Sequence, residues 1–246
     1  MGEKALSTSG HSKVHSPATE NLLIIGGTSS LSRYICELAL GDGWSVYSTF
    51  RNENKKFLPD RLNWIYLNFE ELESVDKALR QLDKVKFKKV IYLVGEISGI
   101  QNMDTPFVDL DSYFKRNISV PVWFLKDLML NQEFGEGSTF TYMSSRASRL
   151  GSNDFCYGIA KASIENFVKS LSLLPTLKIK FKVLQSGLIL GSGMQSKMPP
   201  EVVKAHMDKS GDGLIDAASI ASQIWKFSDF REPVTNLEVL EVGPSY

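Results

Sequence analysis

The chain has 246 residues, of which 43% are hydrophobic, and its 28 basic side chains balance 28 acidic ones. This size accommodates one large domain or two small ones, and the composition is typical of a globular protein with a sizeable core. The charge balance gives no reason to expect a nucleic-acid or anionic-membrane partner. No apolar run approaches the roughly 18 residues of a spanning helix, so no membrane partner is expected.

The first 20 residues are rich in Ser, Thr, Lys and His and lack apolar periodicity. A signal peptide needs an apolar centre, so the composition predicts a disordered tail over 1–20. His11 and His15 lie in this tail, where solvated side chains are favoured over a metal role. Cys36 and Cys156 are far apart and form neither a metal-ligand spacing nor a disulfide framework. We therefore expect no metal and a cytoplasmic, reducing location.

From residue 21 onward, short apolar runs alternate with helical periods. The runs predict strands at 22–25, 44–50, 62–67, 90–94, 140–143, 181–184 and 237–242. The periods predict helices at 31–40, 71–82, 111–130, 153–173 and 216–227, and Pro121 should kink the third or mark its start. This alternation predicts one α/β domain over 21–246, a doubly wound parallel sheet (Rossmann fold) in three αβα layers. Ligands then bind at the carboxyl ends of the strands.

The first predicted strand runs into a turn of small residues, Gly26-Gly27-Thr28-Ser29-Ser30-Leu31-Ser32. Such a turn lets backbone amides approach a pyrophosphate at a helix N-terminus, and the hydroxyls of Thr28, Ser29 and Ser30 can add hydrogen bonds. Ser30 and Ser32 stand where the G-x-G-x-x-G pattern usually has glycines. The alternative is an ordinary small-residue turn with a serine N-cap.

The residue after the second strand indicates which dinucleotide is bound. A carboxylate there would bind the ribose 2'-hydroxyl and select NAD, but the first acid is Glu53. Arg51 instead offers a guanidinium to a 2'-phosphate, so NADP(H) is favoured over NAD. The alternative for Arg51 is a solvated charge, since Lys55 lies in the same basic loop. Asn68, after the third strand, either contacts the adenine edge or serves as a strand-end turn residue.

Tyr157 and Lys161 lie four residues apart and therefore share one helix face. A phenol with a pKa near ~10 is a poor acid–base catalyst at pH 7, and a neighbouring ammonium lowers that pKa. The pair suits proton transfer to a carbonyl oxygen. Upstream lie Asn117, unfavourable in mid-helix, and Ser144-Ser145 at a strand end.

The order Asn, Ser, Tyr-x-x-x-Lys on a nucleotide-binding βαβ chain resembles the short-chain dehydrogenase/reductase superfamily in its single-domain form. The resemblance implies that Tyr157 is the catalytic acid–base and that Lys161 lowers its pKa and binds the nicotinamide ribose. It implies that Ser145 hydrogen-bonds the substrate carbonyl, with Ser144 as the competitor for that role. Asn117 resembles the asparagine that holds a water in the proton relay.

The resemblance also points to further cofactor contacts and to positions where this sequence differs from the family pattern. The usual Asn-Asn-Ala-Gly after the fourth strand reads Tyr-Leu-Val-Gly at 92–95, so only Gly95 survives. The usual Pro-Gly after the sixth strand reads Ser186-Gly187, and Ile189 remains where its backbone would bind the nicotinamide carboxamide.

The segment 191–213 takes the position of the family's substrate lid. Met194, Met198 and Met207 would offer flexible apolar surface to a substrate. His206 is expected to be a solvated helix residue rather than a substrate contact.

These features predict an NADP-dependent oxidoreductase that transfers hydride between NADPH and a ketone or secondary alcohol. Apolar residues on more than one side of helices 111–130 and 153–173 predict a homodimer or homotetramer. The alternatives are a non-catalytic NADP-binding regulatory protein, or a sugar-nucleotide epimerase or dehydratase, which usually needs a larger C-terminal domain. The sequence does not identify the small-molecule substrate.

Overall fold

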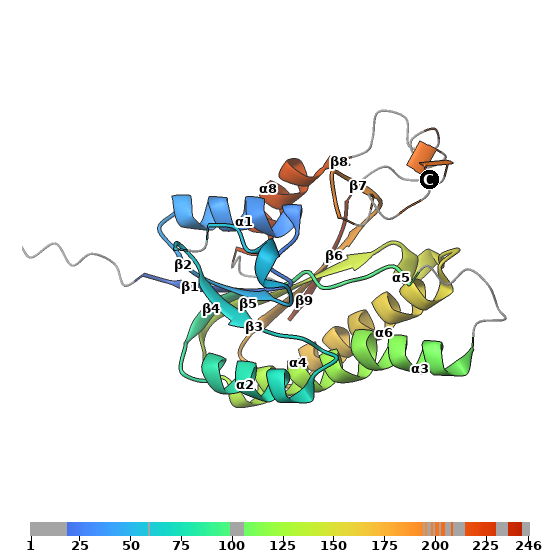
Figure 1. Cartoon of the computed structure of the whole chain (residues 1–246). Helices are drawn as coiled ribbons and strands as arrows, with labels where there is room; N and C mark the ends of the chain where they lie inside the picture. The colour runs from blue at the N-terminus through green and yellow to red at the C-terminus, as the bar shows by residue number, and fades with distance from the viewer. Residues whose placement is uncertain are drawn as a thin grey trace, which may run out of the picture.

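The computed structural model describes residues 19–58, 60–98, 106–193, 195, 198, 200, 201, 203, 204, 208, 215–229 and 236–242. Helices cover both faces of a parallel sheet, which gives the three αβα layers seen in Figure 1. The predicted fold class is therefore confirmed. The first 18 residues, with His11 and His15, lie outside the described part of the chain.

The sheet has seven strands in the order β3-β2-β1-β4-β5-β6-β9, and every pair is parallel. The strands are β1 (Asn21–Ile25), β2 (Ser45–Phe50), β3 (Asn63–Tyr66), β4 (Phe87–Tyr92), β5 (Phe134–Ser145), β6 (Lys180–Ser186) and β9 (Leu237–Val242). The order reverses between β1 and β4. A crevice forms at such a switch point, outside the carboxyl ends of the strands.

The two faces of the sheet are covered by different helices (Figure 1). One face carries α1 (Ser30–Gly41) and α8 (Ala217–Phe227), and the other carries α2 (Leu72–Leu82), α4 (Val120–Asn131) and α6 (Phe155–Ser172). Shorter elements are α3 (Phe107–Phe114), α5 (Ala147–Leu150), η1 (Glu53–Lys55) and the strand pair β7 (Ile189–Leu190) and β8 (Ile215–Asp216).

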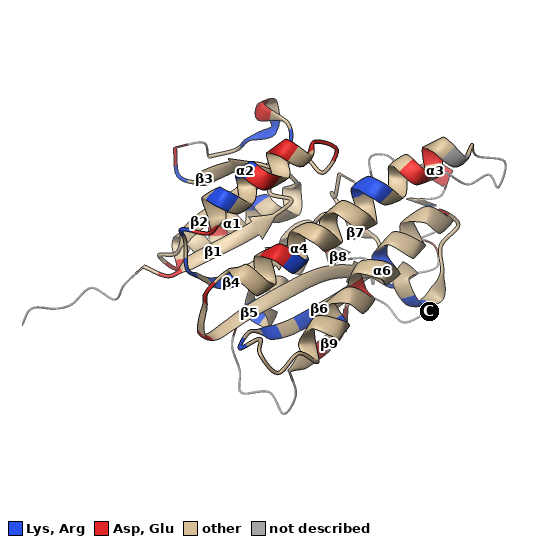
Figure 2. Cartoon of the chain, turned by 90° about the horizontal axis from the view of Figure 1, so that it is seen from below, with Lys and Arg blue, Asp and Glu red and all other residues tan. Residues whose placement is uncertain are grey.

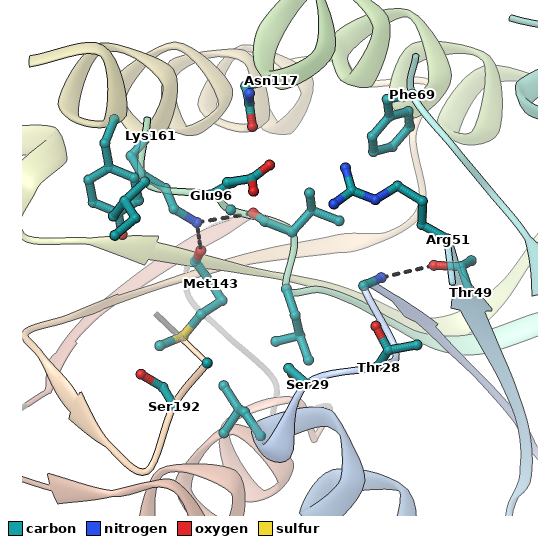
Figure 3. Close-up of a pocket in the computed structure, with 18 of the residues that line it drawn as sticks. Thr28, Ser29, Thr49, Arg51, Phe69, Glu96, Asn117, Met143, Lys161 and Ser192 are labelled. Carbon is teal, nitrogen blue, oxygen red and sulfur yellow. Dashed lines mark hydrogen bonds between the residues drawn. The ribbon is translucent and has the colours of Figure 1, made fainter. Parts of the chain in front are cut away.

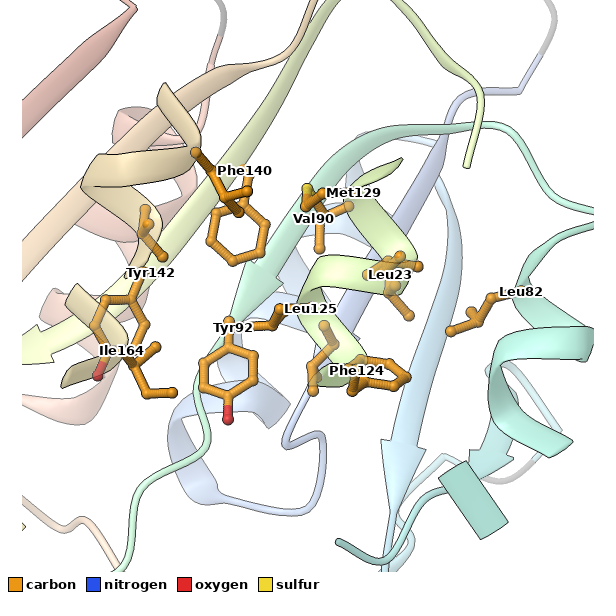
Figure 4. Close-up of a cluster of buried hydrophobic side chains, with 14 of the residues drawn as sticks. Leu23, Leu82, Val90, Tyr92, Phe124, Leu125, Met129, Phe140, Tyr142 and Ile164 are labelled. Carbon is orange, nitrogen blue, oxygen red and sulfur yellow. The ribbon is translucent and has the colours of Figure 1, made fainter. Parts of the chain in front are cut away.

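Alternating side chains of the central strands divide the core into two clusters. Leu23 of β1 packs on the α2/α4/α6 side, whereas Leu22 packs on the α1/α8 side, and both are fully buried. Figure 4 shows the larger cluster, in which Phe124 and Leu125 of α4 meet the sheet. Both faces of the strands are covered, which explains why their sequences are continuous apolar runs.

The helix predicted over 111–130 is interrupted. α3 ends at Phe114, a π-helical segment, η2, spans Lys115–Ser119, and α4 begins at Val120. Pro121 is the second residue of α4, and it has no N–H to donate to the carbonyl of Asn117 one turn earlier. The prediction that Pro121 marks a break is confirmed, and the break leaves one backbone acceptor of Asn117 without its α-helical partner.

Several apolar residues of α4 that suggested a subunit contact are covered by the chain itself. Val120, Leu125 and Leu128 are buried in the core, while Trp123 and Leu130 stay 37% and 49% exposed. Charged residues are sparser along α4 and α6 than along α2 (Figure 2). Within the described ranges, no helix is long and apolar enough to span a membrane.

Candidate active site

A cavity of about 380 Å³ opens at the carboxyl ends of the central strands, at the switch point between β1 and β4. Figure 3 shows how side chains from both halves of the sheet converge on it. The sequence-predicted residues that line it are Gly26, Thr28, Ser29, Ser30, Leu31, Arg51, Asn68, Gly95, Asn117, Ser144, Tyr157, Lys161, Gly187 and Ile189. A volume in this range suits a small-molecule or cofactor site.

The turn after β1 is pressed against β2, which explains its two glycines. Gly26 has a φ of +93° and donates its N–H to Thr49 Oγ1 at 2.9 Å. A Cβ on Gly27 would lie 1.8 Å from Ser48 Oγ and 2.8 Å from the Thr49 carbonyl oxygen. Only glycine fits at this approach, and the turn thereby presents the start of α1 to the cavity.

The serines of this turn are engaged mainly within the protein. Ser29 caps α1 by accepting from the N–H of Ser32 at 3.1 Å, and Ser30 donates to the carbonyl of Gly191 at 2.7 Å. Ser32, at a usual glycine position, is fully buried and donates to the Ser29 carbonyl at 2.7 Å. The hydroxyls of Ser29 and Ser30 therefore already have protein partners. The helix N-terminus still directs backbone N–H groups toward an anion.

One end of the cavity is cationic. Arg51, Lys55 and Arg116 line it, and the exposed Arg51 guanidinium extends over the cavity from the end of β2 (Figure 3). Arg116 lies 3.5 Å from Glu70 and 5.5 Å from the ring centre of Tyr113. This end offers positive charge to a phosphate group.

Asn68 is hydrogen-bonded within the turn that follows β3. Its Nδ2 donates to Glu71 Oε1 at 2.8 Å, and its Oδ1 accepts from the N–H of Glu70 at 3.2 Å. The Ser74 hydroxyl closes the same turn, because it accepts from the Asn68 N–H and donates to the Asn68 carbonyl, at 2.9 Å each. The residue lines the cavity, but its amide already holds this turn.

Tyr157 is positioned by the cap of its own helix. Asp154 caps α6 by accepting from the Tyr157 N–H at 3.0 Å, and it also accepts from the N–H and hydroxyl of Ser98 at 2.7 and 2.6 Å. Asp154 thus joins the loop after β4 to the start of α6. Burial raises the pKa of Tyr157 to about 12, and the Ser145 hydroxyl opposes this rise. Of the two adjacent serines, Ser144 is the one that lines the large cavity with Tyr157.

Lys161 is 5% exposed, and its Nζ donates to the carbonyls of Val94 at 3.1 Å and Met143 at 2.9 Å. Gly95 makes room for it, because a Cβ there would lie 2.6 Å from Nζ. Burial lowers the pKa of Lys161 to about 7, and the charge of Glu165 opposes this.

The expectation that Lys161 lowers the pKa of Tyr157 is wrong for this arrangement. Nζ lies 5.9 Å from the centre of the Tyr157 ring and is held by two carbonyls. Desolvation of the buried phenol dominates instead. The consequence is that Tyr157 is protonated at neutral pH.

A second cavity of about 10 Å³ lies behind Tyr157 and Lys161, bordered also by Asn117 and Tyr92. This volume is enough for about one water molecule. Asn117 Nδ2 donates to the Tyr113 carbonyl at 3.0 Å, and Pro121 has no N–H to donate to the backbone carbonyl of Asn117. Asn117, Tyr157 and Lys161 of the predicted constellation therefore border both cavities, whereas Ser145 lines neither and its neighbour Ser144 lines the larger one.

Sequence reasoning missed three carboxylates at this site. Glu96 lines both cavities, Asp154 caps α6, and Glu165 accepts from the Ser144 hydroxyl at 2.6 Å. The position of Glu165, four residues after Lys161 on the same helix, was the available signal. Glu96 and Asp154 follow from loop geometry that periodicity does not reveal.

No family model and no curated protein matches the sequence. Solved structures do match over nearly the whole chain. A dehydrogenase/reductase from Sinorhizobium meliloti 1021 is 16% identical with a TM-score of 0.76, covering 91% of this chain and 94% of that one. A short chain dehydrogenase family protein from Francisella tularensis subsp. tularensis SCHU S4 is 16% identical with a TM-score of 0.73, covering 91% of this chain and 97% of that one. The chain has the short-chain dehydrogenase/reductase fold.

A further structure with this fold, BdcA in complex with NADPH, is 16% identical with a TM-score of 0.72, over 91% and 93% of the two chains. Within the short-chain dehydrogenase/reductase fold, this chain places the buried Tyr92 where an asparagine is usual, 5.7 Å from the ring of Tyr142. Among the described residues, no three His, Cys, Asp or Glu side chains could hold a metal ion. Met194, His206 and Met207 lie outside the described residues.

Proposed function

We propose that the protein is an NADP-dependent oxidoreductase of the short-chain dehydrogenase/reductase type, acting on a ketone or secondary alcohol. The observation that carries this proposal is the buried Tyr157, with Lys161 one turn away on α6, in the cavity that the glycine turn also borders. A phenol that is neutral at pH 7 carries a proton that it can donate to a carbonyl oxygen as that oxygen gains negative charge.

The residues present fit a dinucleotide. A Cβ at Gly27 would collide with β2, so the turn is built for close backbone approach, and the start of α1 would hold the pyrophosphate. Arg51 would hold the 2'-phosphate, with Gly187 and Ile189 at the nicotinamide end of the cavity. When bound, NADPH supplies the hydride.

The chain's own groups would supply and position the proton. Ser145 would hydrogen-bond the carbonyl oxygen, and Tyr157 would donate its proton to that oxygen. Lys161, with a pKa lowered to about 7, and a water in the small cavity at the Asn117 carbonyl would return a proton to Tyr157. General acid catalysis of this kind is typically worth about 10²–10⁴-fold in rate.

We further propose that the segment 191–213 covers the substrate and that the chain forms a dimer or tetramer through α4 and α6. The hydrogen bond from Ser30 to the Gly191 carbonyl supports the first proposal, because it joins the phosphate turn to the start of this segment. The exposed apolar residues Trp123, Leu130 and Ile159 support the second.

A panel of ketones and aldehydes tested for NADPH oxidation would test the proposed function. We expect turnover of at least one carbonyl class with NADPH, and loss of that turnover in Tyr157→Phe. Turnover retained by Tyr157→Phe would contradict the proposed role of the phenol.

A further inference from the structure

Glu165 is a buried carboxylate on α6 that the proposed reaction does not use directly. It is 4% exposed, yet both of its oxygens are engaged. Oε2 accepts from the hydroxyls of Ser144 at 2.6 Å and Ser148 at 2.7 Å. Oε1 accepts from Nε2 of Gln185 at 2.8 Å and lies 2.7 Å from Nζ of Lys169.

These contacts come from four different elements. Ser144 is the penultimate residue of β5, Ser148 lies in α5, Gln185 lies in β6, and Lys169 follows one turn later on α6. A buried carboxylate is costly unless it is paired and hydrogen-bonded, so full engagement of both oxygens makes this connection stable. Glu165 therefore ties the strand end that carries Ser145 to the helix that carries Tyr157.

The network engages the side chain of only one of the two adjacent serines, Ser144. Ser144 has a single hydroxyl proton and donates it to Glu165, whereas the Ser145 hydroxyl accepts from the N–H of Ala147 at 3.2 Å and its own proton is not used in that contact. Ser148 reinforces this arrangement, because its one hydroxyl proton is shared between the Ser145 carbonyl and Glu165, each 2.7 Å away. The bend after β5 is thus fixed on both sides of Ser145.

We propose that Glu165 is a positioning residue that fixes the strand end carrying Ser144 and Ser145 relative to Tyr157 on α6, and that its carboxylate favours the charged form of the neighbouring Lys161. The positioning half of this inference, which concerns the end of β5, rests on the proposed function. The electrostatic half, which concerns the charge of Lys161, does not. Glu165 lies one helical turn beyond Lys161 on the same face of α6.

The surroundings of Lys161 leave few other sources of negative charge. Its own helix contributes Tyr157, with the ring centre 5.9 Å away, and Glu165 one turn later. β5 contributes Tyr142, with the ring centre 5.2 Å away, and Tyr92 of β4 borders the same small cavity. Tyr113 of α3 and Glu96 of the loop after β4 border that same cavity. Burial raises the pKa of Tyr92, Tyr113, Tyr142 and Tyr157, so these phenols stay neutral. The Glu165 charge opposes the downward shift of the Lys161 pKa.

The electrostatic half is tested by a pH titration of the Lys161 side-chain Cε–Hε signal by NMR, assigned with Lys161→Arg. Glu165→Gln should lower the pKa of Lys161 by at least about half a unit, because an opposite charge favours the charged form of a base. The matched control is Glu73→Gln on α2, which removes a glutamate paired with a lysine at i+4 in the same way, at 2.6 Å, far from the site. An unchanged Lys161 pKa in Glu165→Gln would overturn this half. The titration needs no turnover, so it stands or falls independently of the proposed function.

The positioning half is tested with Glu165→Asp, which keeps the charge but withdraws the carboxylate by one methylene from Ser144 and Ser148. For a carbonyl that the wild type reduces, kcat should fall roughly 10-fold or more with little change in KM, since sub-ångström displacement of a catalytic group is costly. The Lys161 pKa should stay closer to the wild-type value than it does in Glu165→Gln. Wild-type kcat in a folded Glu165→Asp protein would overturn the positioning role.

Discussion

Gly27→Ala tests whether the turn after β1 requires close backbone approach. The new Cβ would lie 1.8 Å from Ser48 Oγ and 2.8 Å from the Thr49 carbonyl oxygen. Ser48 is fully buried, and the Thr49 carbonyl accepts the Gly27 N–H at 2.9 Å, so neither neighbour can retreat without moving β2. Overpacking of this kind costs about 1–3 kcal/mol, and each kcal/mol lowers Tm by about 2–4 °C for a domain of this size.

The assay is thermal unfolding followed by circular dichroism, together with NADPH binding measured by calorimetry. Gly27→Ala should lower Tm by about 2–12 °C and weaken NADPH binding, because the displaced turn no longer presents the start of α1. Gly41→Ala is the matched control, since a Cβ there meets nothing within 4 Å and the residue has an ordinary helical position. A Gly27→Ala protein with the Tm and NADPH affinity of Gly41→Ala would refute the reasoning.

Three further predictions concern the cofactor, the proton relay and the assembly. Arg51→Ala should weaken NADPH binding about 10- to 100-fold more than NADH binding, and equal losses in calorimetry would mean that Arg51 does not meet the 2'-phosphate. The rate of carbonyl reduction should fall as pH rises through about 7, where Lys161 loses its charge, and this inflection should be absent from the pH profile of Lys161→Ala. Light scattering after size exclusion should give a dimer or tetramer mass, and a mass near 27.5 kDa at micromolar concentration would contradict the oligomer.

Much of the fold could be predicted because buried parallel strands leave continuous apolar runs. β1, β2 and β9 begin and end within one residue of their predicted bounds. β5 is longer than predicted, Phe134–Ser145 rather than 140–143. Its first half contains two glycines and polar residues, and Ser138 and Thr139 are buried through hydrogen bonds to backbone carbonyls that the sequence does not reveal. Apolar periodicity cannot identify such a strand.

The sequence predicted that Tyr157 and Lys161 share one helix face at the candidate site, but it did not predict the electrostatics of the site. The spacing of Tyr157 and Lys161 correctly placed both on one side of α6 at the cavity. The spacing suggested that the Lys161 ammonium lowers the pKa of the Tyr157 phenol. Burial of the phenol instead raises that pKa. Likewise, the partners of Ser144 and Ser145 depend on Glu165 and on the bend after β5, which are tertiary features.

The most direct test of the central proposal is single-turnover reduction of an accepted ketone by pre-bound NADPH, comparing wild type with Tyr157→Phe by stopped-flow absorbance. Because the substitution removes only the hydroxyl, NADPH affinity should stay within about threefold, a change worth well under 1 kcal/mol. The rate of hydride transfer should fall by about 10²-fold or more, since the carbonyl oxygen loses its proton donor. A Tyr157→Phe protein that binds NADPH normally and reduces the ketone at the wild-type rate would contradict the proposed mechanism.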